Sequence, residues 1–314
     1  MILHPSLKDY WNKQVSELVH IETPDLDHGL RERHRLYSLM LMSVIHYYWN
    51  GNKRGRNGVY PLNLQTLNLA ESPYLDRDYL GHNIAAIAVD GNGYIVDFDF
   101  NHNEIFSSSA EHAEMRVVKR VYSLSQINDS WQLGNNPERK YRSFSDLTLY
   151  TSLESCAQCS GVMTLARVKE IVYLQSDPGQ YLIGNIMRNL SREGDDYPAP
   201  RPLNAAHFDF EYCLRLDEAY SAFYKAEPLF FIDSEGKSDY TKSMTSFLCT
   251  EEAYLIYSNA KREFMDYIQG KKLLQFGLYV PDRRSGVLTN EKVLQEVKDF
   301  YEYAIYNGRR GTAH

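Results

Sequence analysis

The alternation of apolar and polar residues is clearest in the middle of the chain. Residues 83–89 form an apolar run of strand length, and Tyr94 to Phe100 alternates between apolar and polar positions. Between them stands Asp90-Gly91-Asn92-Gly93, a sequence that favours a tight hairpin turn. The pattern therefore predicts two consecutive antiparallel strands, over residues 83–89 and 94–100.

Helical and extended patterns alternate further along the chain. The expected elements are a helix from about residue 110, a strand at 147–151, a helix from Cys156 to about Lys169, a strand at 171–175, a helix at about 208–226 and a strand at 228–232. If the fifth strand lies beside the fourth, the intervening helix implies a parallel crossover, because a hairpin would need only a tight turn. The sequence predicts an α/β fold with a five-stranded mixed sheet in which strands 4 and 5 are parallel.

The segments outside this core are predicted to be mainly helical. Helical periodicity covers about residues 30–49 before the core, and 251–269 and 290–306 after it. The predicted organisation is therefore a helical N-terminal extension (1–80), an α/β domain (81–233) and a helical C-terminal extension (234–314).

Two stretches within the α/β domain are expected to be irregular. About residues 126–145 contain clustered Asn, Asp and Gly, which indicates a loop insertion. Residues 198–202 contain three prolines, which favour an extended, polyproline-like strap across a surface.

The global charge of the chain does not point to nucleic acid. The net charge is −7 and the pI is about 5.8, although a local basic face can still hold a structured RNA. Arg31, Arg33 and Arg35 are candidates for phosphate contacts, but a solvated helix face explains them more simply. With no secretory leader, no apolar stretch long enough to span a membrane and four cysteines that suit a reducing compartment, the protein is expected to be cytoplasmic and free of membranes.

Two short clusters carry most of the chemical information. His112-Ala113-Glu114 and Cys156-Ala157-Gln158-Cys159 supply one imidazole, one carboxylate and two thiols. Two cysteines three apart at a helix start present both sulfurs on one face, and the helix N-terminus favours the thiolate form that binds metal. A redox pair would not need His112 and Glu114, and a structural zinc site would want a fourth Cys or His. The clusters therefore predict one catalytic zinc ion held by His112, Cys156 and Cys159, with Glu114 nearby but not a ligand.

The same residues match the zinc nucleobase deaminase signature, H-x-E followed by P-C-x-x-C, except that Ser155 stands where the signature has proline. Ser155 is a good helix N-cap, so the helix start need not be lost. The chain resembles the cytidine-deaminase superfamily, and residues 149–154 and the alanine of His112-Ala113-Glu114 resemble its tRNA adenosine deaminase and guanine deaminase branch. This resemblance implies a three-layer α/β/α deaminase fold, with the helical extensions added to it.

The resemblance also implies roles for individual residues. Asn101 stands where bacterial tRNA adenosine deaminases hold an asparagine against the target base, and Ala113 joins it in the expected substrate site; a turn asparagine is the alternative. The neighbouring His102 is expected at the surface. Glu114 would carry protons while an exocyclic amine of a nucleobase is hydrolysed to a carbonyl with release of ammonia.

Three functions stay open at this point. The large extensions slightly favour a base in RNA, such as adenosine in tRNA, while the acidic balance favours a free base, nucleoside or nucleotide of the guanine or cytosine type. The third is an inactive, zinc-bound deaminase-like subunit, against which the presence of Glu114 argues. The expected partners are a nucleobase-containing substrate and, because compact members of this branch commonly dimerise, a second copy of the chain.

Overall fold

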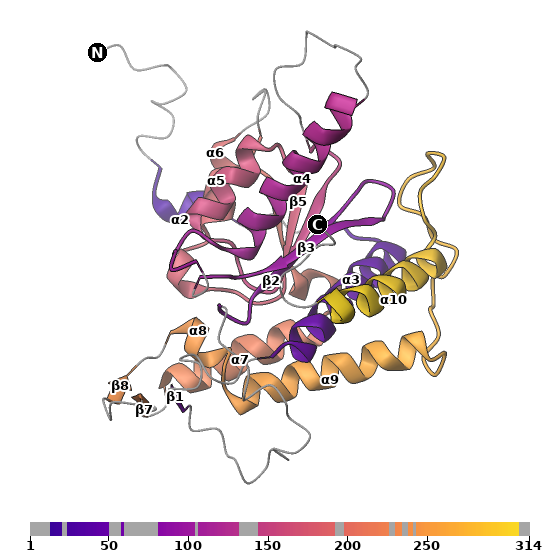
Figure 1. Cartoon of the computed structure of the whole chain (residues 1–314). Helices are drawn as coiled ribbons and strands as arrows, with labels where there is room; N and C mark the ends of the chain where they lie inside the picture. Colours follow the sequence, from indigo (N-terminus) through magenta and orange to yellow (C-terminus); the bar gives the residue numbers. More distant parts are fainter. Residues whose placement is uncertain are drawn as a thin grey trace, which may run out of the picture.

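The computed structural model of the protein has a central sheet with helices on both faces (Figure 1). The structure describes residues 13–20, 24–49, 58–59, 81–103, 106–131, 144–191, 198–225, 230–233, 238–240 and 243–307.

The sheet has the strand order β3-β2-β4-β5-β6. The strands are β2 (Ala85–Val89), β3 (Ile95–Phe100), β4 (Thr148–Thr151), β5 (Glu170–Tyr173) and β6 (Arg201–Asn204). β2 pairs antiparallel with both β3 and β4, whereas β4, β5 and β6 run parallel to one another. The predicted hairpin and the five-stranded mixed sheet with parallel strands 4 and 5 are therefore confirmed.

The identity of the fifth strand was predicted wrongly. β6 (Arg201–Asn204) occupies the edge beside β5, within the segment expected to be a proline-rich strap. An edge strand tolerates Pro202 because one side of its backbone needs no ladder partner. The parallel crossover is made by α6 (Ile183–Leu190) instead of the later helix.

The predicted strand at 228–232 does exist, but in another sheet. β7 (Phe230–Asp233) pairs antiparallel with β1 (Gly58–Val59) and with β8 (Ser238–Tyr240) in a small three-stranded sheet. An apolar run can indicate an extended conformation, but its strand partner is decided by tertiary contacts that periodicity does not reveal.

One face of the main sheet packs against α4 (Ala113–Trp131) and α5 (Ala157–Leu165). Four strand residues share a core cluster with these two helices: Ala86, Ala88, Leu149 and Ile171. α5 ends earlier than predicted, since Arg167 adopts a left-handed conformation (φ 56°) before β5 begins. α4 continues through residues 126–131 of the predicted loop insertion, and residues 132–143 of it lie outside the described part of the chain.

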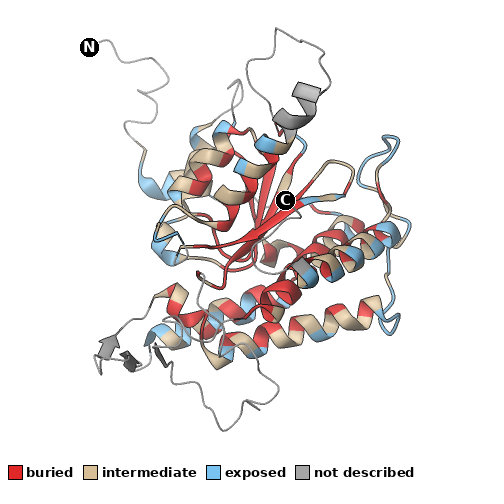
Figure 2. Ribbon diagram, viewed as in Figure 1, coloured by how far each residue is buried: buried red, intermediate tan, exposed pale blue. Residues whose placement is uncertain are grey.

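The opposite face of the sheet packs against a second group of helices. These helices are α3 (His28–Tyr47), α7 (Glu211–Lys225), α9 (Glu251–Ile268) and α10 (Asn290–Asn307), with the short α8 (Met244–Phe247) beside α7. The short α2 (Val15–Leu18) instead contacts α6, where Asn189 donates to the Leu18 carbonyl. α3 lies between the sheet and α9 and α10, and most of its residues are buried (Figures 1 and 2). The helices predicted at 30–49, 208–226, 251–269 and 290–306 correspond to α3, α7, α9 and α10. The domain boundaries at residues 80 and 233 stay a prediction.

The arginines of α3 hold this helical layer together. Arg33 is buried and donates to Asn290 Oδ1 (3.1 Å) and to the Leu288 carbonyl, so the solvated face expected for it is wrong. Arg35 pairs with Glu263 on α9 at 2.7 Å, and Arg31 pairs with Asp209 at 2.6 Å. These cations therefore have structural partners within the chain.

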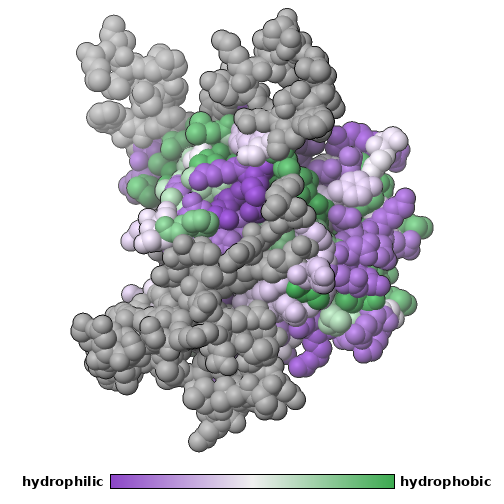
Figure 3. All heavy atoms as spheres, viewed as in Figure 1, coloured by the Kyte–Doolittle hydropathy of each residue, from purple (hydrophilic) through white to green (hydrophobic). Residues whose placement is uncertain are grey.

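The outer surface of the helical layer is largely polar. Figure 3 shows hydrophilic residues gathered on its right-hand side, where α10 and the connection between α9 and α10 lie. Among the residues that the structure describes, no helix combines the length and the apolar character that crossing a membrane requires.

Candidate zinc and substrate site

The residues of the predicted site meet at the end of the main sheet where β4, β5 and β6 have their last residues. Thr151, Tyr173 and Asn204, the last residues of β4, β5 and β6, are paired in register with one another. β3 is antiparallel to β2, and β2 is antiparallel to β4, so β3 runs in the same direction as β4. Its last residue therefore lies at the same end of the sheet, immediately before Asn101. Carboxyl ends of strands in an open α/β sheet are where binding sites form.

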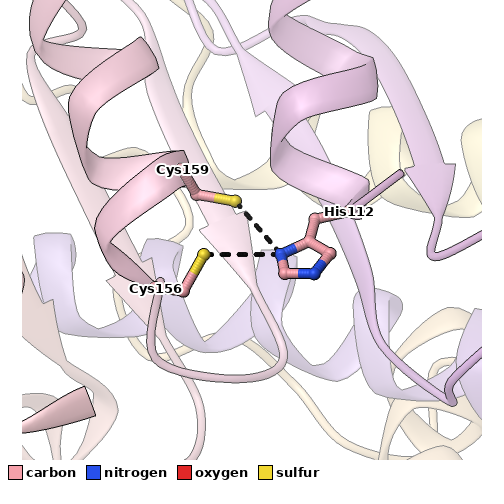
Figure 4. A group of neighbouring side chains, drawn as sticks. All are labelled: His112, Cys156 and Cys159. Atoms are coloured by element: carbon pink, nitrogen blue, oxygen red, sulfur yellow. Dashed lines mark hydrogen bonds between the residues drawn. The ribbon is translucent and has the colours of Figure 1, made fainter. Parts of the chain in front are cut away.

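Two helix starts bring the three predicted metal ligands together. His112 immediately precedes α4, Cys156 is the N-cap of α5, and Cys159 lies in the first turn of α5. His112 Nδ1 lies 3.4 Å from Cys156 Sγ and 3.6 Å from Cys159 Sγ, and both sulfurs point toward this nitrogen (Figure 4).

This arrangement fits zinc. Tetrahedral coordination with Zn–S and Zn–N distances of about 2.3 and 2.0–2.1 Å places sulfur and nitrogen ligands about 3.6 Å apart. The two observed S···N distances agree with that value, and one ligand atom from each of the three residues lies within 4.8 Å of the others. Within the described ranges of the chain, no other group of His, Cys, Asp and Glu side chains meets this criterion.

The surroundings of Cys156 favour its thiolate. Its contact with Cys159, followed by the hydrogen bond with His112, lowers the pKa of the Cys156 thiol to about 4 despite partial burial. The contact with Cys156 in turn raises the pKa of the His112 imidazole. A thiolate at the start of a helix is the form that a metal ion binds.

Glu114 lies beside the three ligands, in the first turn of α4. Its carboxylate is almost fully buried, Oε2 is 3.7 Å from Cys159 Sγ, and Oε1 accepts a hydrogen bond from the Ser155 hydroxyl at 2.9 Å. Burial raises the pKa of the Glu114 carboxyl, which favours a group that can hold a proton as well as release it.

The expectation that Ser155 is the N-cap of α5 is wrong. The N-cap is Cys156, and no side chain makes the capping hydrogen bond. The Ser155 hydroxyl instead reaches α4 and contacts Glu114. The only sequence signal of this contact was the departure from proline in the P-C-x-x-C signature.

Asn101 lies at the end of β3 and faces the start of α4. Its Oδ1 accepts a hydrogen bond from the Ala113 backbone N–H at 2.8 Å, and the residue is only 2% exposed. The side chain thus satisfies one N–H at the start of a neighbouring helix, rather than forming a local turn. With the carboxamide oxygen engaged, the amide NH₂ is the end of Asn101 suited to an acceptor atom of a base.

A buried charge network missed by the sequence analysis supports this end of the sheet. Arg116 on α4 donates to Asp99 Oδ2 (2.8 Å) and Glu111 Oε2 (2.5 Å), linking β3 to the residue before His112. His102, expected at the surface, is 2% exposed and lies 3.6 Å from Asp99. The sequence signal of this network was the alternation of Asp97 and Asp99 within β3, together with Arg116 and Arg120 one turn apart on the following helix.

Comparison with known families agrees with the geometry of the site. Residues 64–175 match the model of the cytidine and deoxycytidylate deaminase zinc-binding region. This stretch includes His112 and Glu114, and it also includes both cysteines of the candidate zinc centre. Residues 64–175 are therefore similar to this zinc-binding region.

One relative matches about a third of this chain. The chain is 30% identical over 108 residues to the tRNA-specific adenosine deaminase of Bacillus subtilis (strain 168). The aligned residues make up 34% of this chain and 58% of that protein, so the chain spans little more than half the relative's length.

Solved structures of deaminases show more distant similarity. A tRNA:A34 deaminase shares 19% identity, with 39% of this chain and 82% of that chain covered and a TM-score of 0.28. The guanine deaminase of Bacillus subtilis shares 20% identity (38% and 70% covered, TM-score 0.26). The guanine deaminase of Nitrosomonas europaea shares 16% identity (66% and 88% covered, TM-score 0.29).

Proposed function

We propose that the protein is a zinc-dependent hydrolytic deaminase of nucleobases. The observation that carries the proposal is the convergence of His112, Cys156 and Cys159 with a buried Glu114 carboxylate 3.7 Å from Cys159 Sγ. Three soft or borderline ligands leave one tetrahedral position for water, and a carboxylate that is not needed as a ligand can serve as an acid–base group. An inactive scaffold would have no use for that carboxylate.

His112, Cys156 and Cys159 would hold a zinc ion, which would supply the acidity that lets a water lose a proton near neutral pH. Glu114 would accept the proton released as a water oxygen bonds to the ring carbon that bears the amine. Glu114 then returns protons to the ring nitrogen and to the departing amine, so the C–N bond breaks and ammonia leaves. Asn101 orients the base through its amide NH₂, and the Ala113 N–H fixes the Asn101 side chain.

We infer that the substrate is a base in RNA, with adenosine in tRNA as the leading candidate. The similarity to a tRNA-specific adenosine deaminase supports this choice. A free base or nucleotide, such as guanine, is the second candidate because the charges of the chain do not favour a polynucleotide. The chain is acidic, and the arginines of α3 that were candidates for phosphate contacts are engaged within the protein.

The experiment is an ammonia-release assay on zinc-loaded protein with matched substrates: free bases, nucleosides, nucleotides and unmodified tRNA. Glu114→Gln is the control, because it preserves the size of the side chain and removes the proton carrier. We expect release from tRNA, with an A-to-inosine change found by sequencing, and a loss of about 10²-fold or more in the control. Release from a small molecule alone would support the second candidate, and full activity of the Glu114→Gln protein would refute the mechanism.

Two further properties belong to the same proposal. A homodimer is a prediction carried by the resemblance to compact deaminases, and a cytoplasmic location is a prediction from the cysteine content and the other sequence features given above. Light scattering coupled to gel filtration tests the first, and imaging of the tagged full chain in its own cell tests the second.

A further inference from the structure

The contact between Ser155 and Glu114 is specific to this chain's version of the deaminase signature. The signature places proline before the first cysteine, and proline has neither a hydroxyl nor a backbone N–H to donate. Here Ser155 is 5% exposed and donates its hydroxyl hydrogen to Glu114 Oε1 at 2.9 Å. The substitution therefore adds a hydrogen-bond donor at the centre of the site.

The contact crosses between the two helices that carry the ligands. Glu114 belongs to α4, and Ser155 immediately precedes the N-cap of α5. With Oε1 held by Ser155, the other carboxylate oxygen, Oε2, faces Cys159 Sγ at 3.7 Å. The hydrogen bond thus fixes the rotation of the Glu114 carboxylate, with one oxygen on Ser155 and the other toward the zinc ligands.

The energetic reason for the contact is the burial of Glu114. A carboxylate that is 4% exposed needs hydrogen-bond donors, since an unsatisfied buried charge is costly. Among the described residues, its donors are its own backbone N–H, the Cys159 thiol at Oε2 and the Ser155 hydroxyl at Oε1. The backbone donor is fixed by α4, and Cys159 has no proton to donate once it binds zinc as a thiolate. Ser155 is therefore the donor that can set the direction of the carboxylate when the metal is bound.

We propose that Ser155 is a positioning residue that orients the Glu114 carboxylate toward the reacting groups, which rests on the proposed deaminase function. The hydroxyl neither binds zinc nor exchanges protons with the substrate in this role. Catalysis depends on the placement of the acid–base group to a fraction of an ångström. Loss of the Ser155 hydroxyl should therefore lower kcat while KM changes little.

The chain offers a matched control. Ser160 is a buried serine within α5, one residue after Cys159, and its hydroxyl has no hydrogen-bond partner among the described residues. Ser160→Ala removes the same kind of atom from a nearby buried position without touching Glu114. Ser155→Thr keeps the hydroxyl and should restore the contact.

The first measurement is steady-state kinetics with zinc content determined for each variant. Ser155→Ala should bind one zinc ion and lose about tenfold in kcat, with KM within about threefold of the wild type. Ser155→Thr and Ser160→Ala should each stay within about threefold in kcat. A Ser155→Ala protein with wild-type kcat, or one matched in its loss by Ser160→Ala, would overturn the inference.

The second measurement does not depend on activity. A double-mutant cycle compares the urea midpoint of unfolding of zinc-loaded wild type, Ser155→Ala, Glu114→Ala and the double variant. Ser155→Ala should lower the midpoint when Glu114 is present and change it little when Glu114 is alanine. Coupling in a wild-type protein that deaminates no substrate would refute the proposed function and retain the orienting contact, whereas equal effects in both backgrounds would overturn the contact itself.

Discussion

Arg116→Met tests whether the buried charge network positions the zinc ligands. Arg116 connects Asp99, whose side chain is fully buried, with Glu111, the residue before His112. Its guanidinium also lies over the Phe106 ring, 5.1 Å from the centroid. Methionine keeps much of the volume and removes both ion pairs, so the variant isolates their contribution.

The expected loss of stability depends on the interactions that Asp99 and Glu111 keep when Arg116 is replaced. Hydrogen bonds to charged groups contribute about 1.5–3 kcal/mol each. Asp99 retains its pair with Arg120, and Glu111 is 21% exposed and can be partly rehydrated. We therefore expect Arg116→Met to lower the free energy of unfolding by about 2 kcal/mol, near the lower end of that range. Because Glu111 precedes His112, zinc affinity should fall by about 10-fold or more, as for other residues that orient metal ligands.

Arg120→Met is the matched control, one helical turn further from His112. Arg120 pairs with the buried Asp97 at 2.9 Å, and its removal leaves that carboxylate without its cation. The loss of stability should therefore be larger, about 3–5 kcal/mol. Zinc affinity should change by less than about threefold, because no partner of Arg120 adjoins a ligand.

Urea unfolding measures the stabilities, and competition with a chromogenic chelator under native conditions measures the zinc affinities. We expect the two variants to rank differently in the two measurements. Arg120→Met should be the less stable variant, and Arg116→Met should bind zinc more weakly. Equal zinc affinities for both variants, or a greater loss in Arg120→Met, would refute the positioning role of Arg116.

Three further predictions address the metal site, the pH dependence and the backbone. Cys156→Ala should contain much less than one zinc per chain and unfold at a lower temperature, because the site joins the starts of α4 and α5; a normal metal content and calorimetric midpoint would contradict the ligand assignment. Burial raises the pKa of Asp97 from 3.8 to about 6, so the wild type loses stability as the pH rises through this range. Between pH 4 and 8, the free energy of unfolding of Asp97→Asn, measured with urea, should therefore rise by about 3 kcal/mol relative to that of the wild type. A difference between the two proteins that stays constant with pH would argue against this assignment. A Cβ on Gly81 would lie 2.1 Å from the Asn101 carbonyl oxygen, so Gly81→Ala should lower stability and raise KM, while Gly161→Ala, whose added Cβ meets nothing within 4 Å, should leave both unharmed.

The candidate zinc residues could be chosen from the sequence because their signals are local. Cys156 and Cys159 share a helix face through their spacing, and His112 and Glu114 stand at the start of another helix. The ligand chemistry is a property of the side chains themselves, so their convergence could be expected before the fold was known. The hairpin at Asp90 to Gly93 and helices α3, α7, α9 and α10 were predictable for the same reason, because turn chemistry and periodicity act over a few residues.

Tertiary structure alone decided the contacts between distant segments. β6 became the fifth strand although Pro202 obscured its pattern, because the open edge of β5 can accept a short strand whose other side needs no partner. Arg33 and His102 were expected at the surface, yet both are buried. Asn290 of α10 accepts a hydrogen bond from Arg33, and the buried Asp99 lies 3.6 Å from His102. The hydrogen bond from Ser155 to Glu114 joins residues 41 positions apart in the sequence. Such partners are selected by packing and by the cost of burying an unpaired polar group, and neither can be read from a local sequence pattern.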